Sequence, residues 1–134
     1  AGAGGGMGGG CVGFLQASIS PGIDLVMDYL HFSETVKGAD LVITGEGKID
    51  RQTLFGKVPV GIAGVAAAQN IPVIAITGQV DVDQELKQAG ISAIFPIHPS
   101  PVSLEEAMQP VYAVRNIKRT MEQICQTLLI LVKK

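Results

Sequence analysis

Three short apolar runs decide the fold class, and they read DLVIT at 40–44, PVIAIT at 72–77 and SAIFPI at 92–97. Each run is continuous rather than alternating, which is typical of strands that are buried on both faces of a parallel sheet. Segments with helical spacing lie between them, at 59–69 and 81–89. This order predicts an α/β fold, a parallel sheet with right-handed crossovers and helices on both faces.

Further helices are expected on either side of the three runs. Ser20-Pro21 precedes apolar residues at helical spacing, which predicts a helix with Ser20 as N-cap and Pro21 as its first residue. A short helical turn is expected at 33–38. Residues 103–106 read SLEE, a capping box, and a long amphipathic helix is expected after Pro110. The expected architecture is a three-layer domain of the flavodoxin-like or Rossmann-like kind.

Size and composition exclude several classes of protein. A chain of 134 residues with 47% hydrophobic and 16% charged residues has material for one core, so residues 1–134 are expected to form a single domain. A net charge of −2 without a basic tract argues against binding to nucleic acid. The apolar runs are shorter than the ~18 residues of a membrane span, so we expect a cytoplasmic protein with no membrane partner.

The richest polar segment is TGEGKIDRQT at 44–53, directly after the first predicted strand. Ligands of open parallel sheets bind at the carboxyl ends of the strands, where this segment would lie as a loop. Two glycines flank Glu46, which indicates backbone that approaches a ligand or adopts positive φ. We predict a functional loop, with an ordinary polar turn as the alternative. Its candidate residues are Gly45, Glu46, Gly47, Lys48, Asp50, Arg51, Gln52 and Thr53, followed by Lys57.

The first thirteen residues, AGAGGGMGGGCVG, include eight glycines. The spacing G-x-G-x-x-G occurs twice there, beginning at Gly4 and again at Gly8. Two interpretations stand side by side, a flexible segment that tolerates close helix packing and an anion site built from backbone N–H groups. Because the chain begins at Ala1 and continues at once into glycine, we also expect a segment of a longer polypeptide.

Other familiar motifs are absent or weak. Lys48 and Lys57 are not followed by Ser or Thr, which excludes the Walker A motif of P-loop NTPases. The two cysteines lie far apart without companion histidines, so neither a zinc site nor a disulfide is indicated. His31 and His98 are interpreted as ordinary surface or capping histidines.

Residues 38–63, GADLVITGEGKIDRQTLFGKVPVGIA, closely resemble the type I glycerate kinase family. The glycine tract, the segment 20–26 and the order of the remaining elements fit the same family, so the resemblance covers the whole chain. Lys48 stands where the family most often has Arg, which keeps the charge but loses bidentate geometry. The resemblance implies a longer, two-domain enzyme that uses ATP and Mg²⁺ to phosphorylate D-glycerate to 2-phosphoglycerate. This chain would be its C-terminal portion, partnered by the missing N-terminal portion, and the assembly into oligomers stays open.

Phosphoryl transfer needs cations, a carboxylate for magnesium and a base for the alcohol proton. Within the resemblance, the candidate catalytic residues are Asp50, Glu46 and Lys48, with Glu46 or Asp50 as the magnesium ligand or the base. Lys48 and Lys57 would pair with the carboxylate or phosphate of the substrate. The remaining candidates for substrate or phosphate binding are Gly4, Gly6, Gly8, Gly9, Gly45, Gly47, Arg51, Gln52 and Thr53.

Two alternatives accompany these assignments. Asp50 and Arg51 would also suit a structural ion pair within the loop. The chain as a whole would also suit a small-anion-binding α/β module without catalysis, although a mere scaffold would not need so many charges in one loop.

Overall fold

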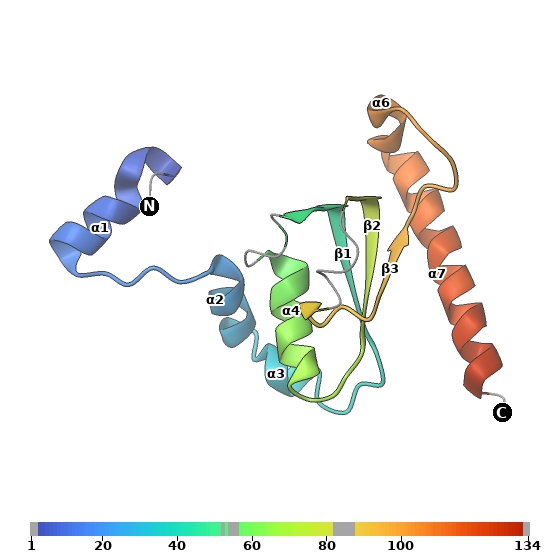
Figure 1. The fold of residues 1–134 in the computed structure, drawn as a ribbon, viewed down its shortest axis with the longest axis horizontal. Helices are drawn as coiled ribbons and strands as arrows, with labels where there is room; N and C mark the ends of the chain where they lie inside the picture. Colours follow the sequence, from blue (N-terminus) through green and yellow to red (C-terminus); the bar gives the residue numbers. More distant parts are fainter. Residues whose placement is uncertain (1–2, 52, 54–56, 82–87, 133–134) are drawn as a thin grey trace.

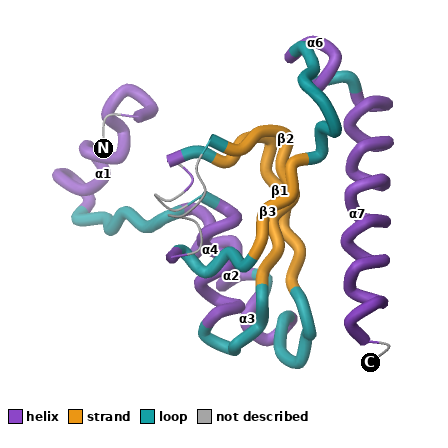
Figure 2. The backbone as a smooth tube through the Cα atoms, turned by 45° about the vertical axis from the view of Figure 1, so that its right-hand side comes forward, coloured by secondary structure: helices purple, strands orange, loops and turns teal. Residues whose placement is uncertain are grey.

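A computed structural model describes residues 3–51, 53, 57–81 and 88–132. Three parallel strands form one sheet in the order β1-β2-β3: β1 (Val42–Ile49), β2 (Val73–Val80) and β3 (Ala93–Pro96). Helices lie on both sides of this sheet (Figures 1 and 2), with α2, α3 and α4 on one side and α7 on the other. The predicted α/β class, with its parallel sheet between two helical layers, is confirmed.

The first two strands are longer than the sequence predicts. Val42 pairs with Val73 at one end of β1 and Ile49 pairs with Val80 at the other. The segment from Gly45 to Ile49, predicted as a loop, is therefore strand, and that prediction is wrong. The reason lies opposite it, at Gly78, where an added Cβ would be 2.7 Å from the carbonyl oxygen of Gly47. Because position 78 is glycine, the two backbones can continue side by side.

The hydrophobic core lies between the sheet and α4 (Val58–Ala67). Ala63 and Ala66 of this helix are fully buried, as are Val73 and Ala75 of β2. Short alanine side chains let the helix approach the sheet closely, as the composition of 59–69 predicts. Each large aliphatic side chain fully buried in such a core contributes about 1.5–3 kcal/mol.

Two short helices extend this layer, α2 (Gly22–Tyr29) and α3 (Phe32–Thr35). The predicted helix start is wrong by one residue, because Pro21, not Ser20, is the N-cap of α2. Pro21 has the extended ψ of 134°, and its carbonyl oxygen accepts a hydrogen bond from the N–H of Asp24. Gly61 of α4 faces α2, where an added Cβ would lie 2.8 Å from Ile23 Cγ1.

The second helical layer consists of α6 (Leu104–Ala107) and α7 (Pro110–Val132). The predicted N-cap is confirmed at Ser103, whose Oγ accepts a hydrogen bond of 3.2 Å from the N–H of Glu106. In the described part of the chain, no helix has the length and apolar character needed to cross a membrane. The predicted helix at 81–89 falls largely on residues 82–87, which lie outside the described residues.

The glycine tract folds into the 3₁₀ turn η1 (Ala3–Gly6) and the helix α1 (Met7–Leu15). Gly4, Gly5 and Gly6 have φ between 62° and 85°, a left-handed conformation that glycine adopts without strain. Both elements project away from the sheet and its helices (Figure 1), joined to them by residues 16–21, which belong to no helix or strand.

Candidate functional site

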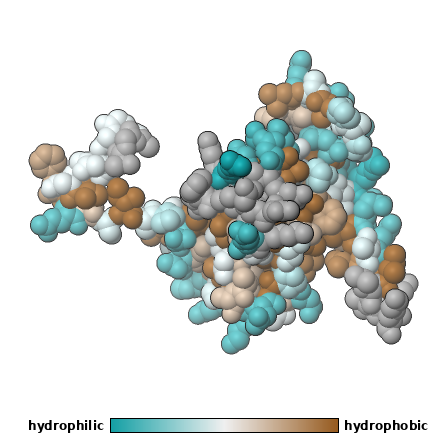
Figure 3. Space-filling view, in the orientation of Figure 1, coloured by the Kyte–Doolittle hydropathy of each residue, from teal (hydrophilic) through white to brown (hydrophobic). Residues whose placement is uncertain are grey.

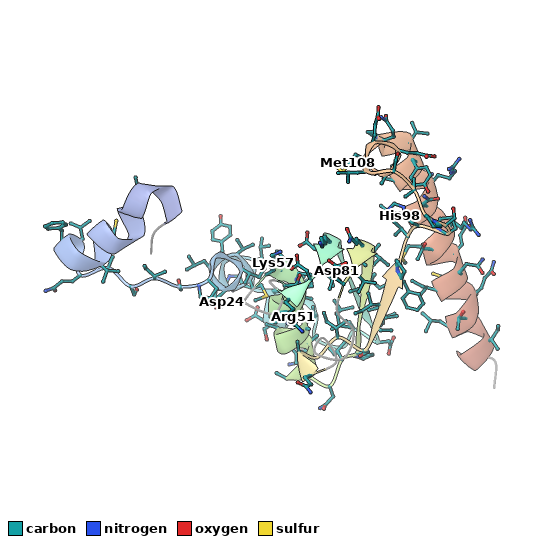
Figure 4. All side chains as sticks on the ribbon, turned by 45° about the horizontal axis from the view of Figure 1, so that its top comes forward. Asp24, Arg51, Lys57, Asp81, His98 and Met108 are labelled. Carbon is teal, nitrogen blue, oxygen red and sulfur yellow. The ribbon has the colours of Figure 1, made fainter. Side chains whose placement is uncertain are left out.

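Charged side chains gather where β1 and β2 end, at the carboxyl edge of the sheet. Lys48 Nζ lies 2.6 Å from Asp81 Oδ2, and Lys57 Nζ lies 3.6 Å from Asp50 Oδ1. Figure 4 shows Arg51, Lys57 and Asp81 in this region of the molecule. One pair joins β1 to Asp81, the residue after β2, and the other joins Asp50, the residue after β1, to Lys57, the residue before α4. We call Lys48, Asp50, Lys57 and Asp81 the charged cluster.

The Lys48–Asp81 pair holds both of its members in the ionised form. The hydrogen bond to Asp81, and then the opposite charge, raise the pKa of Lys48 above its ordinary value of 10.5. The same bond from Lys48, followed by a hydrogen bond from Gln79 Nε2 at 2.9 Å, lowers the pKa of Asp81 below its ordinary 3.8. Both side chains are exposed to solvent, so the pair orients a cation more than it stabilises the fold.

Asp50 and Thr53 shape the turn that follows β1. The backbone N–H of Asp50 donates to Thr53 Oγ1 at 3.1 Å, and the N–H of Thr53 donates to Asp50 Oδ1 at 3.3 Å. Thr53 is fully buried. The structure therefore uses this predicted binding residue to position Asp50. Arg51 lies exposed beside it, and Gln52 lies outside the described residues.

Glu46 lies half-buried in the middle of the predicted site. Its Oε1 accepts a hydrogen bond of 3.0 Å from the N–H of Gly47. Strand alternation places Glu46 and Lys48 on one face of β1, with Gly45 and Gly47 on the opposite face. The predicted site residues of 45–48 are thus divided between the two faces of the sheet.

A groove of about 1160 Å³ opens on the face that carries the glycines. Its floor includes Gly45, Gly47 and Gly78, and its far wall comes from α6 and α7. Most of the other side chains that line it are apolar: Ile76, Ile97, Pro101, Val102, Leu104, Ala107, Met108, Ala113 and Ile117. His98 and Ser100 complete this lining, and Glu46, Lys48, Thr77 and Gln79 border the groove from positions whose side chains lie on the other face of the sheet.

His98 has a different environment from the ordinary surface or capping position expected from the sequence. It lines the groove, and its ring stacks on that of Tyr112 with 5.7 Å between the ring centroids. Its Nδ1 is buried and has no hydrogen-bond partner among the described residues. Figure 4 shows His98 at the base of the loop that joins β3 to α6. One signal could have found it, because His98 follows the carboxyl end of the third predicted strand.

The structure does not bring the glycine tract to this edge of the sheet. Gly4 and Gly6 lie in η1 and Gly8 and Gly9 in α1, apart from the sheet and the charged cluster (Figure 1). In the described chain these four glycines lie apart from Glu46 and Asp50, and their role in binding substrate or phosphate stays a prediction.

The sequence matches the glycerate kinase family over residues 1–129. The chain belongs to the glycerate kinase family. It is 47% identical over 125 residues to a glycerate kinase of Bacillus cereus, a match that covers 92% of this chain and 32% of the relative. It is 43% identical over 131 residues to the glycerate 2-kinase of Escherichia coli, covering 97% of this chain and 34% of the relative. The chain thus spans about a third of the length of the curated relatives it matches.

The family match supports the resemblance that residues 38–63 carry. It also raises the question of which carboxylates could hold a metal ion. Among residues 3–51, 53, 57–81 and 88–132, no group of three or more His, Cys, Asp or Glu side chains is arranged to hold a metal ion. Mg²⁺ in phosphoryl-transfer enzymes needs only one or two carboxylates, because water and phosphate oxygens supply the other ligands. The half-buried carboxylates of Glu46 and Asp50 fit that smaller requirement.

Proposed function

We propose that the complete protein carrying this chain is a cytoplasmic glycerate kinase that converts ATP and D-glycerate to ADP and 2-phosphoglycerate. This chain would be its C-terminal portion and would form one α/β domain. The observation that carries the proposal is the charged cluster at the carboxyl edge of the sheet, in a chain that belongs to this family. Phosphoryl transfer depends mainly on positioned charges of this kind.

The reaction breaks the bond between the γ-phosphorus of ATP and its bridging oxygen and forms a bond to the 2-hydroxyl oxygen of glycerate. Glu46 or Asp50 would receive the proton of that hydroxyl or hold Mg²⁺. The bound Mg²⁺ would supply positive charge to the phosphate oxygens. Lys48 and Lys57 would neutralise the phosphate or substrate carboxylate. Their pairing with Asp81 and Asp50 supports this role, because it holds two cations at the same edge of the sheet.

The test measures ADP release by the complete protein with magnesium ATP and D-glycerate. Asp50→Asn and Glu46→Gln remove one charge each while keeping the size of the side chain. We expect the variant that loses the base to lose about 100-fold or more in turnover. Phosphorus NMR of the product distinguishes 2-phosphoglycerate from 3-phosphoglycerate.

Glu122→Gln is the matched control, because it removes an exposed carboxylate from α7. We expect it to keep wild-type turnover. The absence of glycerate-dependent ADP release from the wild-type protein would contradict the proposal. Full activity in both Asp50→Asn and Glu46→Gln would remove these carboxylates from the mechanism.

A further inference from the structure

The floor of the groove beside α6 and α7 is bare backbone. An ideal Cβ built on Gly47 meets nothing within 4 Å, so this position faces open space. The Cβ of a residue at Gly45 would touch only Ile76, at 3.5 Å, and at Gly78 it would lie 3.7 Å from His98 Nε2. Glycines in the interior of a strand often mark the close approach of a ligand. Here three of them leave a flat surface at the carboxyl edge of the sheet.

The walls of the groove select against glycerate as its occupant. Side chains such as Ile97, Leu104, Met108 and Ile117 present hydrocarbon, and a small hydroxy acid placed among them would lose hydration without gaining partners. The volume of about 1160 Å³ also far exceeds what so small a molecule fills. A mostly apolar cleft with a few polar groups is typical of a site for a larger, partly aromatic ligand.

Two polar features define which ligand fits. His98 Nε2 would lie 3.7 Å from a Cβ on Gly78, beside the glycine floor, whereas Nδ1 of the same ring is buried and has no hydrogen-bond partner among the described residues. A neutral imidazole nitrogen acts as donor or acceptor depending on its tautomer, so it suits the edge of a heteroaromatic base. Lys48 borders the groove at the edge of β1, with its side chain on the other face and paired with Asp81, so a cation that complements phosphate stands at the rim.

We propose that this groove binds the purine base of the nucleotide, with the base on the glycine floor and its edge hydrogen-bonded to His98. The phosphates then extend toward Lys48 and the charged cluster. The proposal rests on the proposed function for the presence of a nucleotide. It assigns the apolar groove to the base and leaves glycerate to the charged side of β1.

The experiment titrates the complete protein with Mg·ADP and, separately, with inorganic tripolyphosphate, using isothermal titration calorimetry. Gly47→Ala and Gly47→Val fill the groove in two steps, and valine also suits a strand. Gly64→Ala is the matched control, since Gly64 is an exposed glycine of α4 with open space at its Cβ position. His98→Phe keeps a ring against Tyr112 and removes the hydrogen bond.

We expect Gly47→Val to raise the Kd for Mg·ADP by about tenfold or more, with a smaller effect for Gly47→Ala. His98→Phe should raise it by about two- to tenfold, the range of one hydrogen bond. Tripolyphosphate, which has no base, should bind all variants equally, and Gly64→Ala should bind both ligands like the wild type. Circular dichroism melting of each variant shows whether the fold is kept.

An unchanged Kd for Mg·ADP in folded Gly47→Val overturns the proposal, even if the wild-type protein phosphorylates glycerate. Equal weakening of tripolyphosphate and ADP also overturns it, since the groove would then act on the phosphates. If ADP binding depends on Gly47 and His98 while glycerate-dependent turnover is absent, the base site stands and the glycerate kinase proposal fails. The two proposals are thus tested separately.

Discussion

The two faces of the sheet differ in how tightly they are covered. On the α4 side, Ala63 and Val73 are 0% exposed and belong to one continuous core. On the α7 side, a groove separates the strand ends from the helices, and Val111 of α7 is 83% exposed. Figure 3 shows apolar surface around α6 and down α7. One face therefore holds the closed core of the domain, while the other has an open groove at its strand ends.

The largest expected effect comes from breaking the packed face. Ile91 is 1% exposed and belongs to the core, so Ile91→Ala should lower the free energy of unfolding by about 2–5 kcal/mol. Ile117→Ala makes the same change on α7, where the side chain is 38% exposed and lines the groove. Its cost should be much smaller, because no closed cavity is left behind. Urea denaturation measures both, and equal losses would contradict the difference between the faces.

A second pair of substitutions tests the glycine floor. Gly78→Ala should lower the free energy of unfolding by about 1–3 kcal/mol, because its Cβ would lie 2.7 Å from a backbone oxygen that has little freedom to move. Gly47→Ala meets nothing within 4 Å and should leave the stability unchanged or slightly higher. Thermal unfolding measures the midpoints of both variants, which are compared with that of the wild type. A destabilised Gly47→Ala would show that the groove is filled by other parts of the protein.

The smallest effect on stability is expected from Asp81→Asn, which breaks the ion pair between Asp81 and Lys48 in the charged cluster. The pKa of Asp81 is lower in the folded state than its ordinary 3.8, so its pairing stabilises the fold above that pH. This contribution is lost as the pH falls through the folded-state pKa. It is also lost at high pH, as Lys48 loses its proton above its ordinary 10.5.

Melting curves of wild type and Asp81→Asn across this range of pH measure the contribution. The wild type should melt slightly higher at neutral pH, and the difference should shrink in strong acid and at high salt. A difference that persists in strong acid would assign the effect to something other than the ion pair.

Local sequence patterns predicted much of the fold. The run at 72–77 predicts a buried strand from its apolar residues alone, and β2 contains it. Ser103 predicts the start of α6 because its capping bond to Glu106 reaches only three residues along the chain. The helical start at Ser20-Pro21 was misplaced by one residue, since either residue suits the terminus and local sequence hardly distinguishes them.

The candidate site was predictable only in part. The polar segment at 44–53 pointed to the carboxyl edge of the sheet, where the structure places its described residues. The partner of Lys48 is Asp81, more than thirty residues along the chain, and no local pattern connects the two. The glycine tract was joined to the site by its G-x-G-x-x-G spacing and by the family resemblance, and in the structure it lies apart from the sheet.

By itself, the sequence determined the α/β class, the parallel strands and the family, because hydrophobic periodicity and the segment at 38–63 are local properties. Only the tertiary structure decided that β1 continues through Gly45 and Gly47, since this depends on Gly78 in the neighbouring strand. It also decided that His98 lines a groove, because the residues around His98, Tyr112 among them, come from α7, a distant part of the chain. Contacts between distant segments are set by the packing of the whole chain, which no short stretch of sequence contains.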